Sequence, residues 1–297
     1  MIVVKLMGGH SNQLFQYAIG RKLAKIHNTK LILDLSWFKD FADADTPRFY
    51  ELGCYPLKAS TKELLDDLHI VDSRQDIRLV DKVRRSLHLG NNIWMYYEQG
   101  QGFSTDALKQ PNNTMLIGFW QSEKYFKDIR SNLLKEFEPT TPLSKKNVQI
   151  LADINSTESV WMHVRRGDYV TNKNANKFHG LKGADYYQKG LELLVKKLPV
   201  ERVKNLAIFI CSNDIPWCKK NLKFPYPITF LENELGSDDM RIAKHCKHDI
   251  IANSTFSWWG SWLNENPGKI VIAPKRWFDD EEANSSTDIA LDSWIRI

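Results

Sequence analysis

The second half of the chain alternates short apolar runs with segments of helical periodicity, and this alternation limits the fold more than any other feature. Apolar runs predict strands at residues 160–164, 206–210, 228–231, 249–252 and 269–273. Segments with helical patterns separate them, at residues 185–198, 215–222, 238–246 and 256–263. Strands that alternate with helices favour a parallel sheet covered by helices on both faces. The sequence therefore predicts a doubly wound α/β domain here.

The first half begins with the same kind of pattern. Residues 2–6 predict a strand, apolar positions at three- and four-residue spacing predict a helix over about 13–27, and residues 31–35 predict a second strand. Further along, residues 115–120 predict a strand and residues 121–136 a helix. A strand, a helix and a strand in this order indicate a second parallel sheet.

A proline- and threonine-rich stretch, Pro139-Thr140-Thr141-Pro142, interrupts the helical pattern between the two halves. Such a stretch after a charged helix is typical of a linker, and we place the domain boundary near 140–158. The sequence thus predicts two α/β domains, residues 1–145 and 156–297, both Rossmann-like. Loops at the strand ends of both domains are expected to face a cleft between them.

Composition excludes several classes of protein. The chain has 297 residues, 42% of them hydrophobic, which is enough to form a substantial core. A net charge of +5 without a long basic run gives no support to nucleic-acid binding. The four cysteines show no C-x-x-C spacing, which argues against a zinc or redox site. The first residues lack a signal-peptide pattern, and no apolar run approaches the roughly 18 residues of a membrane span, so we expect a cytoplasmic protein.

Two adjacent arginines follow the strand expected at residues 160–164. The segment reads His163-Val164-Arg165-Arg166-Gly167-Asp168-Tyr169. Open α/β sheets bind ligands just past the carboxyl ends of their strands, and a guanidinium group can hold a phosphate with two hydrogen bonds. The loop is therefore a candidate anion site. The alternative, which the residues alone leave open, is that the arginines form ion pairs with Asp168 and other carboxylates.

Two further turns have the composition of anion-binding turns. Residues 8–13, Gly-Gly-His-Ser-Asn-Gln, and residues 253–257, Asn-Ser-Thr-Phe-Ser, each lie between an expected strand and an expected helix. The N-terminus of a helix offers unpaired backbone N–H groups to an anion. The alternatives are structural: glycine permits a tight turn, Ser11 can cap the first helix, and Ser254 or Thr255 can cap the second.

Three ordered motifs give the chain a resemblance to a known family. They are Gly8-Gly9-x-x-Asn12-Gln13-x-Phe15-Gln16-Tyr17, His163-Val164-Arg165-Arg166-Gly167-Asp168-Tyr169 and Asn253-Ser254-Thr255-Phe256-Ser257-Trp258-Trp259, with Ser212-Asn213-Asp214 and Asp239-Met240 fitting the blocks between them. In this order, and over nearly the whole chain, they closely resemble the bacterial α-1,2-fucosyltransferases of glycosyltransferase family 11. The chain departs from that family at His10-Ser11, where the family often has Leu-Gly.

The resemblance implies a GT-B-like fold of two Rossmann-like domains, with the acceptor side in the N-terminal domain and the donor site in the C-terminal domain. It implies GDP-β-L-fucose as the donor and transfer with inversion to the 2-hydroxyl of a galactoside, without a metal or other cofactor. The residues agree with the last point, because no Asp-x-Asp pair stands at an expected strand end. The pair in Asp43-Ala44-Asp45 lies in a loop rich in small residues.

The resemblance also assigns roles in donor binding. Without a metal, cationic side chains and N–H groups must neutralise the leaving diphosphate. Arg165 is the first candidate for this role and Arg166 the second. Asp239 is assigned to the guanine N1–H and amino groups, and Asn213 to the donor site. His163 is assigned to the nucleoside, although a buried histidine that holds a loop is an equal alternative.

The remaining donor contacts are assigned to the two turns, through Gly9, Asn12, Ser254 and Thr255. Inversion by single displacement requires a base near the acceptor hydroxyl, and the sequence does not single one out. Asp168 and His179 are the candidates, with a structural role open for each. The reaction can alternatively rely mainly on stabilisation of the leaving group.

The acceptor cannot be identified from the residues. The segment 37–115, which is rich in aromatic residues and has little periodicity, is expected to form its site, because aromatic rings pack on sugar C–H faces. Repeat units of a surface polysaccharide and lactose-like galactosides are the candidates, and a lipid-linked acceptor would bring the protein to the inner membrane. Two alternatives stay open: a transferase with another linkage or nucleotide sugar, and a non-catalytic sugar-binding module.

Overall fold

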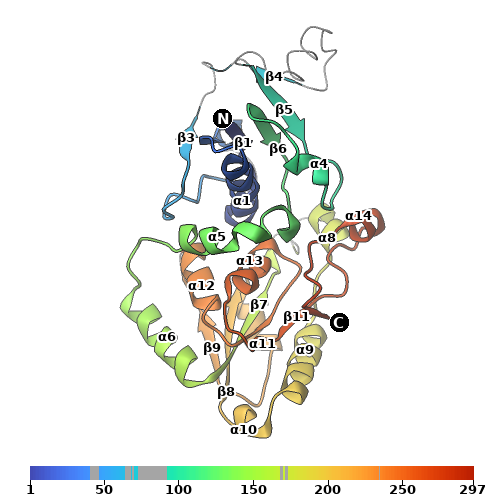
Figure 1. Cartoon of the computed structure of the whole chain (residues 1–297). Helices are drawn as coiled ribbons and strands as arrows, with labels where there is room; N and C mark the ends of the chain where they lie inside the picture. Colours follow the sequence, from blue (N-terminus) through green and yellow to red (C-terminus); the bar gives the residue numbers. More distant parts are fainter. Residues whose placement is uncertain are drawn as a thin grey trace. The chain divides into compact units, whose positions relative to one another are not determined.

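The computed structural model describes residues 1–40, 47–63, 68, 70–72, 92–167, 170, 173–233 and 235–297 (Figure 1). The chain forms two compact units, residues 1–138 and 139–297. The division lies just before the expected boundary stretch at 140–158. Much of that stretch forms a helix of the second unit, α6 (Lys145–Ser156), capped by Ser144. Its apolar face, with Ile150 and Ile154 buried, makes it part of the domain instead of a linker.

The first unit contains a six-stranded sheet in which every pair of neighbouring strands is parallel. The strands are β1 (Ile2–Lys5), β2 (Leu31–Asp34), β3 (Ser60–Lys62), β4 (Ile70–Val71), β5 (Ile93–Tyr97) and β6 (Thr114–Ile117). Their order is β3-β2-β1-β6-β5-β4. The strand expected at 115–120 ends at Ile117, because Gly118 begins a turn in which Trp120 has a φ of 58°, in the left-handed region.

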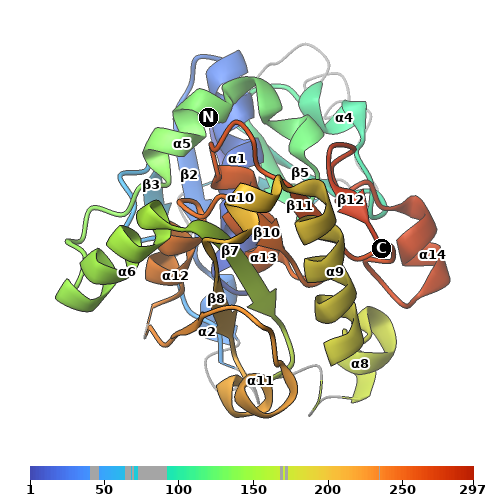
Figure 2. The same ribbon diagram turned by 90° about the horizontal axis from the view of Figure 1, so that it is seen from below.

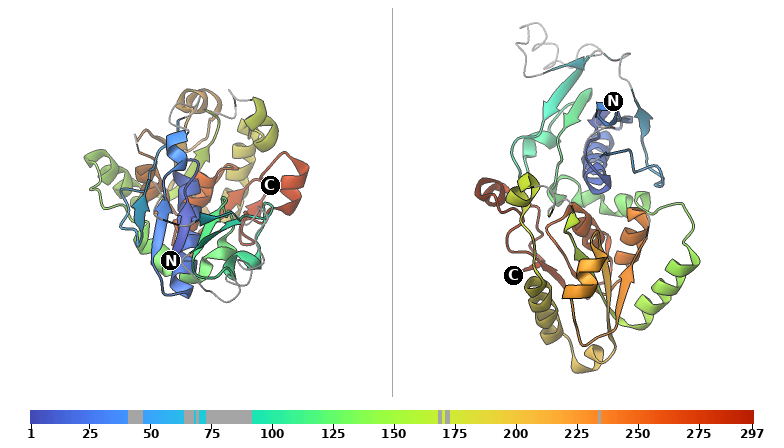
Figure 3. Two further views of the ribbon diagram at one scale, coloured as in Figure 1. Left: turned by 90° about the horizontal axis from the view of Figure 1, so that it is seen from above. Right: turned by 180° about the vertical axis from the view of Figure 1, so that it is seen from behind.

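The helices of the first unit are α1 (His10–Ile26), α2 (Trp37–Asp40), α4 (Thr105–Leu108) and α5 (Arg130–Glu136), with 3-10 turns η1 (Glu123–Tyr125) and η2 (Lys127–Ile129). Helix α1 packs along β1 and β2, where Gly20 lies against Val4 and Leu31, and it is the dark blue helix in the right-hand view of Figure 3. The residue before its first turn is Gly9, so the expectation that Ser11 caps this helix is wrong. The helix expected over 121–136 is divided into η1, η2 and α5.

The second unit has its own six-stranded parallel sheet. The strands are β7 (Glu158–Val164), β8 (Leu206–Ser212), β9 (Ile228–Leu231), β10 (His248–Ile250), β11 (Val271–Ala273) and β12 (Ile295–Arg296). Their order is β12-β11-β10-β7-β8-β9. The chain runs outward from β7 to β9, returns to place β10 beside β7, and runs outward again. Open α/β sheets bind ligands at the point where the strand order reverses, and here that point lies between β7 and β10.

Helices cover both faces of this second sheet. They are α6, α8 (Lys173–His179), α9 (Ala184–Lys197), α10 (Val200–Val203), α11 (Ile215–Asn221), α12 (Gly236–Ala243), α13 (Thr255–Leu263) and α14 (Glu281–Ser286). On one face, Tyr187, Leu191 and Leu194 of α9 pack against Val160 and Met162 of β7. Figure 2 shows α12 on the opposite side of β7 and β8 from α9. Two parallel α/β units are therefore present, as the sequence predicts.

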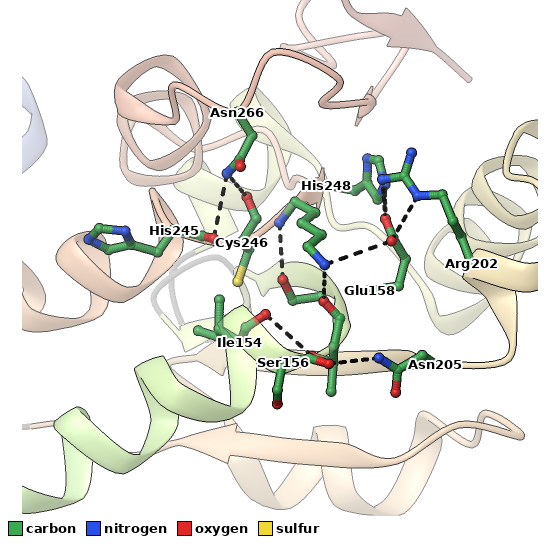
Figure 4. A network of polar contacts seen from close by, with 12 residues as sticks. Ile154, Ser156, Glu158, Arg202, Asn205, His245, Cys246, His248 and Asn266 are labelled. Atoms are coloured by element: carbon green, nitrogen blue, oxygen red, sulfur yellow. Dashed lines mark hydrogen bonds and ion pairs between the residues drawn. The ribbon is translucent and has the colours of Figure 1, made fainter.

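A polar network centred on the buried Glu158 connects elements at the amino edge of the second sheet (Figure 4). Glu158, at the start of β7, accepts hydrogen bonds from Arg202 Nε at 2.9 Å and from His248 Nε2 at 2.7 Å. The Nδ1 atom of His248 accepts from the backbone N–H of Ile270, which leaves the proton on Nε2. Burial opposes ionisation of Glu158, but its bonds to Arg202 and His248 outweigh burial and lower its pKa. The network joins β7, β10 and α10 at the edge opposite to the ligand edge.

Close packing between β7 and α13 gives a test of this arrangement. A Cβ atom added at Gly260 of α13 would overlap the ring of Trp161. We expect Gly260→Ala to lower the free energy of unfolding by about 1–3 kcal/mol, because a filled core cannot accept another carbon. Urea unfolding measures this change. Gly268→Ala is the control, since no atom lies within 4 Å of its added Cβ, and a change within about 0.5 kcal/mol is expected. Equal effects of the two variants would contradict the packing.

Candidate active site

Three loops meet at the carboxyl edge of the second sheet. Strand β7 is paired with β8, with His163 opposite Cys211, and with β10, with Met162 opposite Ile250. Because the strands are parallel and in this register, the segments 165–167, 213–214 and 251–255 leave the sheet side by side. The structure therefore brings together three of the loops that the sequence singles out.

Arg166 is held by structural partners. Its Nε donates to Asp214 Oδ2 at 3.2 Å, and its guanidinium carbon lies 4.0 Å above the centre of the Trp217 ring. Asp214 also caps α11 by accepting from the backbone N–H of Trp217. The ion pair that the sequence left open is therefore formed by Arg166, with Asp214 as its partner. Asp168, the carboxylate that the sequence analysis named as a partner, lies outside the described residues.

The backbone of the arginine loop is fixed by Asn213. The N–H of Arg166 donates to Asn213 Oδ1 at 2.9 Å. A Cβ atom added at Gly167 would overlap the amide group of the same side chain, so only glycine allows this close approach. Asn213, expected to bind the donor, acts in the structure as a clamp on the loop that carries the arginines.

His163 is buried at the end of β7. Its Nδ1 lies 2.5 Å from Ser257 Oγ, and its ring is in contact with Trp161 and Phe256. Burial, assisted by the charge of Arg165, lowers its pKa to about 3. The imidazole is therefore neutral at physiological pH and ties the end of β7 to the first turn of α13. This geometry matches the second alternative for His163, a buried histidine that holds a loop.

The turn after β10 leads into α13. Ser254 caps this helix by accepting from the N–H of Phe256, and Thr255 is its first residue. Asn253 Nδ2 donates to the backbone carbonyls of His179 at 2.6 Å and Trp277 at 3.1 Å. His179 is thus placed beside the Ser254 turn by its main chain.

The ring of His179 has apolar neighbours. It lies against Phe178, with ring centres 4.9 Å apart, and against Phe278, with ring centres 5.6 Å apart. Its proposed role as a base stays a prediction.

Asp239 projects from α12 to the same edge. Asn233 Nδ2 donates to its Oδ1 at 2.6 Å, and the Cys211 thiol donates to its Oδ2 at 3.3 Å. Burial raises the pKa of Asp239, and these two donors partly offset the effect. Each carboxylate oxygen can accept a second bond, so the group remains able to bind a ligand donor. The sequence analysis did not identify Asn233 as a site residue. The one feature that could have indicated it is its position as a polar residue two positions after the end of β9.

The glycine turn of the first unit has its own anionic partner. The N–H of His10, at the start of α1, donates to Glu51 Oε2 at 2.7 Å. Gln13 Nε2 donates to the carbonyls of Gly8 and Phe49, which fixes the same loop from the other side. The backbone N–H of His10, one of the groups predicted to bind a phosphate, is therefore hydrogen-bonded to the carboxylate of Glu51. Gly8, with a φ of 72°, needs glycine for its conformation.

The other residues of this turn face neighbouring loops of the same unit. Asn12 Oδ1 accepts from Gln121 Nε2 at 3.1 Å, and a Cβ atom added at Gly9 would lie 3.4 Å from Arg48. The assignment of Gly9 and Asn12 to the donor stays a prediction.

Across the described segments, no three His, Cys, Asp or Glu side chains are grouped so as to hold a metal ion. The pair Asp43 and Asp45 lies outside those segments. None of the described helices combines the length and the apolar composition that a membrane crossing requires.

The contact between His163 and Ser257 can be tested by measuring the stability of a variant protein that lacks it. Ser257→Ala removes the partner of a buried imidazole, and we expect a loss of about 1–3 kcal/mol in the free energy of unfolding. Because the folded-state pKa of His163 is lowered to about 3, its ring is neutral in the folded protein at both pH 5 and pH 8. The loss caused by the variant should therefore be similar at both pH values in urea unfolding.

Ser285→Ala is a matched control for that experiment. Ser285 is exposed and bonds only to its own helix turn in α14, through the carbonyl of Glu282. A loss for Ser257→Ala no greater than that for Ser285→Ala would contradict a stabilising role for the contact.

Comparisons with known proteins agree with this architecture. The model of the family described as Glycosyl transferase family 11 matches residues 1–297. An α-1,2-colitosyltransferase of Escherichia coli is 33% identical over 307 residues, covering 100% of this chain and 99% of the relative. The O-antigen biosynthesis glycosyltransferase WbnK of Escherichia coli is 32% identical over 313 residues, covering 98% of this chain and 99% of the relative.

Among solved structures, the fucosyltransferase NodZ from Bradyrhizobium superposes with a TM-score of 0.50 and 11% identity, covering 88% of this chain and 93% of NodZ. At this identity the likeness concerns the fold alone, and it confirms the expected GT-B-like class. The family match over the whole length, together with two relatives above 30% identity, shows that the chain belongs to glycosyltransferase family 11.

Proposed function

We propose that this protein transfers L-fucose from GDP-β-L-fucose to the 2-hydroxyl of a galactoside, with inversion, during the synthesis of an O-antigen repeat unit. Membership of the family and the names of its two relatives support a glycosyltransferase of this kind. The observation that carries the donor assignment is the position of Arg165. It follows β7 at the reversal of strand order, where the adjacent strand β10 leads into the N-terminus of α13.

A leaving nucleoside diphosphate gains negative charge in the transition state, and its site must supply positive charge. Arg165 supplies a full charge, and the N-terminus of α13 supplies a partial one. Thr255 adds a hydroxyl at the same turn. Arg166 is paired with Asp214, so we assign it to positioning of the loop. The proposed reaction needs no metal ion, because these groups can neutralise the leaving diphosphate.

Asp239 is the proposed acceptor for the guanine edge. A guanine ring presents an N1–H and an amino group side by side, and a carboxylate can accept from both. Asn233 and Cys211 hold the Asp239 carboxylate in place, which favours binding by reducing the side-chain freedom that would be lost. A uracil ring lacks the amino group and would make one bond fewer.

A second candidate differs only in the donated sugar. One relative is named a colitosyltransferase, and colitose is L-fucose without its 3-hydroxyl. A site that hydrogen-bonds this hydroxyl rejects the deoxy sugar strongly, whereas a site that leaves it in water accepts both. The colitosyl donor is therefore the alternative for this protein. The acceptor in either case is a galactoside, and if that acceptor is lipid-linked the protein works at the inner membrane surface.

Substitution of Arg165 tests the diphosphate assignment. We expect Arg165→Ala to lower kcat by about 10²–10³-fold, because removal of one preorganised group that stabilises developing charge has an effect of this size. GDP affinity, measured by calorimetry, should fall as well. The control is Arg276→Ala, whose partly exposed side chain pairs with Glu281, the first residue of α14. Activity of Arg165→Ala within a few-fold of the wild type, in a folded protein, would contradict the assignment.

A donor panel tests the proposed substrate. The protein is incubated with an array of β-galactosides and with GDP-fucose, GDP-colitose, GDP-mannose or UDP-galactose in turn. We expect the highest kcat/KM with GDP-fucose, no turnover with UDP-galactose, and a product linked to the 2-hydroxyl by methylation analysis. A higher kcat/KM with GDP-colitose would establish the second candidate. Oligosaccharide binding without turnover of any donor would indicate a sugar-binding module.

A further inference from the structure

The carboxyl edge of the first sheet carries a second group of polar side chains. Gln16 ties the loops after β1 and β6 together, because its Oε1 accepts from the N–H of Met7 and its Nε2 donates to the carbonyl of Gly118. The contact between Asn12 and Gln121 joins the first turn of α1 to the loop after β6. Since β6 lies between β1 and β5, the residue that follows β5 reaches this group as well.

That residue is Glu98, and its carboxylate is held in one orientation. Its Oε2 accepts from the N–H of Phe119 at 2.6 Å, and its Oε1 accepts from the N–H of Trp120 at 2.8 Å. The conformation of the turn 118–120 points both N–H groups at the carboxylate. A Cβ atom added at Gly118 would lie 2.7 Å from Glu98 Oε2, and Trp120 adopts a positive φ of 58°.

The environment of Glu98 differs from that of Glu136, another described carboxylate of this unit. Glu136 lies against the guanidinium of Arg21 and the hydroxyl of Tyr17, so a cation balances its charge. The donors to Glu98 are neutral backbone groups. Burial raises the pKa of Glu98 to about 7, although the two N–H donors act in the opposite direction. A carboxylate with this pKa can exchange a proton at physiological pH, which is the property of a general base.

The side chains around Glu98 suit a sugar. Phe119 is 42% exposed and lies in the turn that Glu98 holds. Tyr96 stacks on Trp120 with ring centres 6.1 Å apart. The amide groups of Asn12, in the first turn of α1, and of Gln121, in the loop after β6, are hydrogen-bonded to each other. An exposed aromatic ring such as that of Phe119, together with hydrogen-bonding side chains, is a combination that binds sugar C–H faces and hydroxyls.

We propose that the carboxyl edge of the first sheet binds the acceptor sugar and that Glu98 is the base that activates the acceptor hydroxyl. This inference rests on the proposed transferase function and adds to it the missing base. The hydroxyl oxygen forms a bond to the anomeric carbon of the donor, and the bond from that carbon to the diphosphate breaks. The hydroxyl proton moves to Glu98, and the nucleoside diphosphate leaves with the electron pair of the broken bond.

Holding the Trp120 turn and accepting a proton are compatible roles for Glu98. Each carboxylate oxygen can accept two hydrogen bonds, and the N–H of Phe119 or Trp120 uses one. An exclusively structural role is the competing explanation. It predicts a loss of stability on substitution but no change in the pH dependence of the reaction.

The test is the pH profile of Glu98→Gln, with GDP-fucose as donor and the galactosides of the array that the wild type fucosylates. For the wild type, kcat/KM should fall as the pH drops through about 7, because a protonated Glu98 cannot take the hydroxyl proton. For Glu98→Gln we expect kcat to fall by about 10²–10⁴-fold and this acidic limb to disappear. GDP affinity, by calorimetry, should stay within about two-fold, because the proposal places Glu98 at the acceptor and not at the donor.

Two further variants keep the test decisive. Glu98→Asp retains a carboxylate and should retain the acidic limb with a lower kcat, even if Glu98→Gln fails to fold. Glu136→Gln is a control for the loss of a buried carboxylate on the same unit and should lower stability without changing the pH profile. An acidic limb that persists in Glu98→Gln, or activity within a few-fold of the wild type, would overturn the proposal.

The two proposals fail in different ways. If the wild type fucosylates no galactoside, the proposed function itself is wrong. If the wild type is active and Glu98→Gln retains its rate and pH profile, only the role of Glu98 is wrong.

Discussion

Strand β7 is the element on which the second unit depends. It is buried along its whole length and hydrogen-bonded to β8 on one side and β10 on the other. A backbone with no access to water must have its N–H and C=O groups paired, so its position is fixed by both neighbours. At its amino end, the hydrogen bonds of Glu158 to Arg202 and His248 fix the register of the strand. Its carboxyl end therefore presents Arg165 at one defined place in the sheet.

Charge balance divides the polar residues into structural and chemical groups. Arg166 has Asp214 as its partner, and the N–H of His10 has Glu51. His163 needs no opposite charge beside it, because burial lowers its pKa to about 3 and keeps the ring neutral. Glu98 is the opposite case, a carboxylate whose donors are neutral N–H groups. In the proposed roles, Arg165 stabilises the negative charge of the leaving diphosphate, and Glu98 takes up a proton from the acceptor hydroxyl.

Local patterns predict much of the fold. Apolar runs and helical spacing correctly place β1, α1 and β2 in the first unit and most of the second sheet. They fail at β3, β4 and β5, which are short or half exposed and so lack a clear period. Glu98 follows β5, and its importance could not be seen without the strand. Helices α8 and α14 were missed for a related reason, because their sequences contain too few apolar residues to show a helical period.

The sequence by itself determined the class of the protein: two parallel α/β units, glycine and arginine motifs at strand ends, and membership of a glycosyltransferase family. These follow from periodicity and from short motifs, which are local properties of the chain. Only the tertiary structure decided which strands are neighbours, and so placed the reversal of strand order between β7 and β10. It also decided that Arg166 is paired with Asp214 and that burial raises the pKa of Glu98. The physical reason is that burial and charge pairing depend on residues distant in sequence, such as Arg166 and Asp214 or Glu98 and Trp120, which come together only in the folded chain.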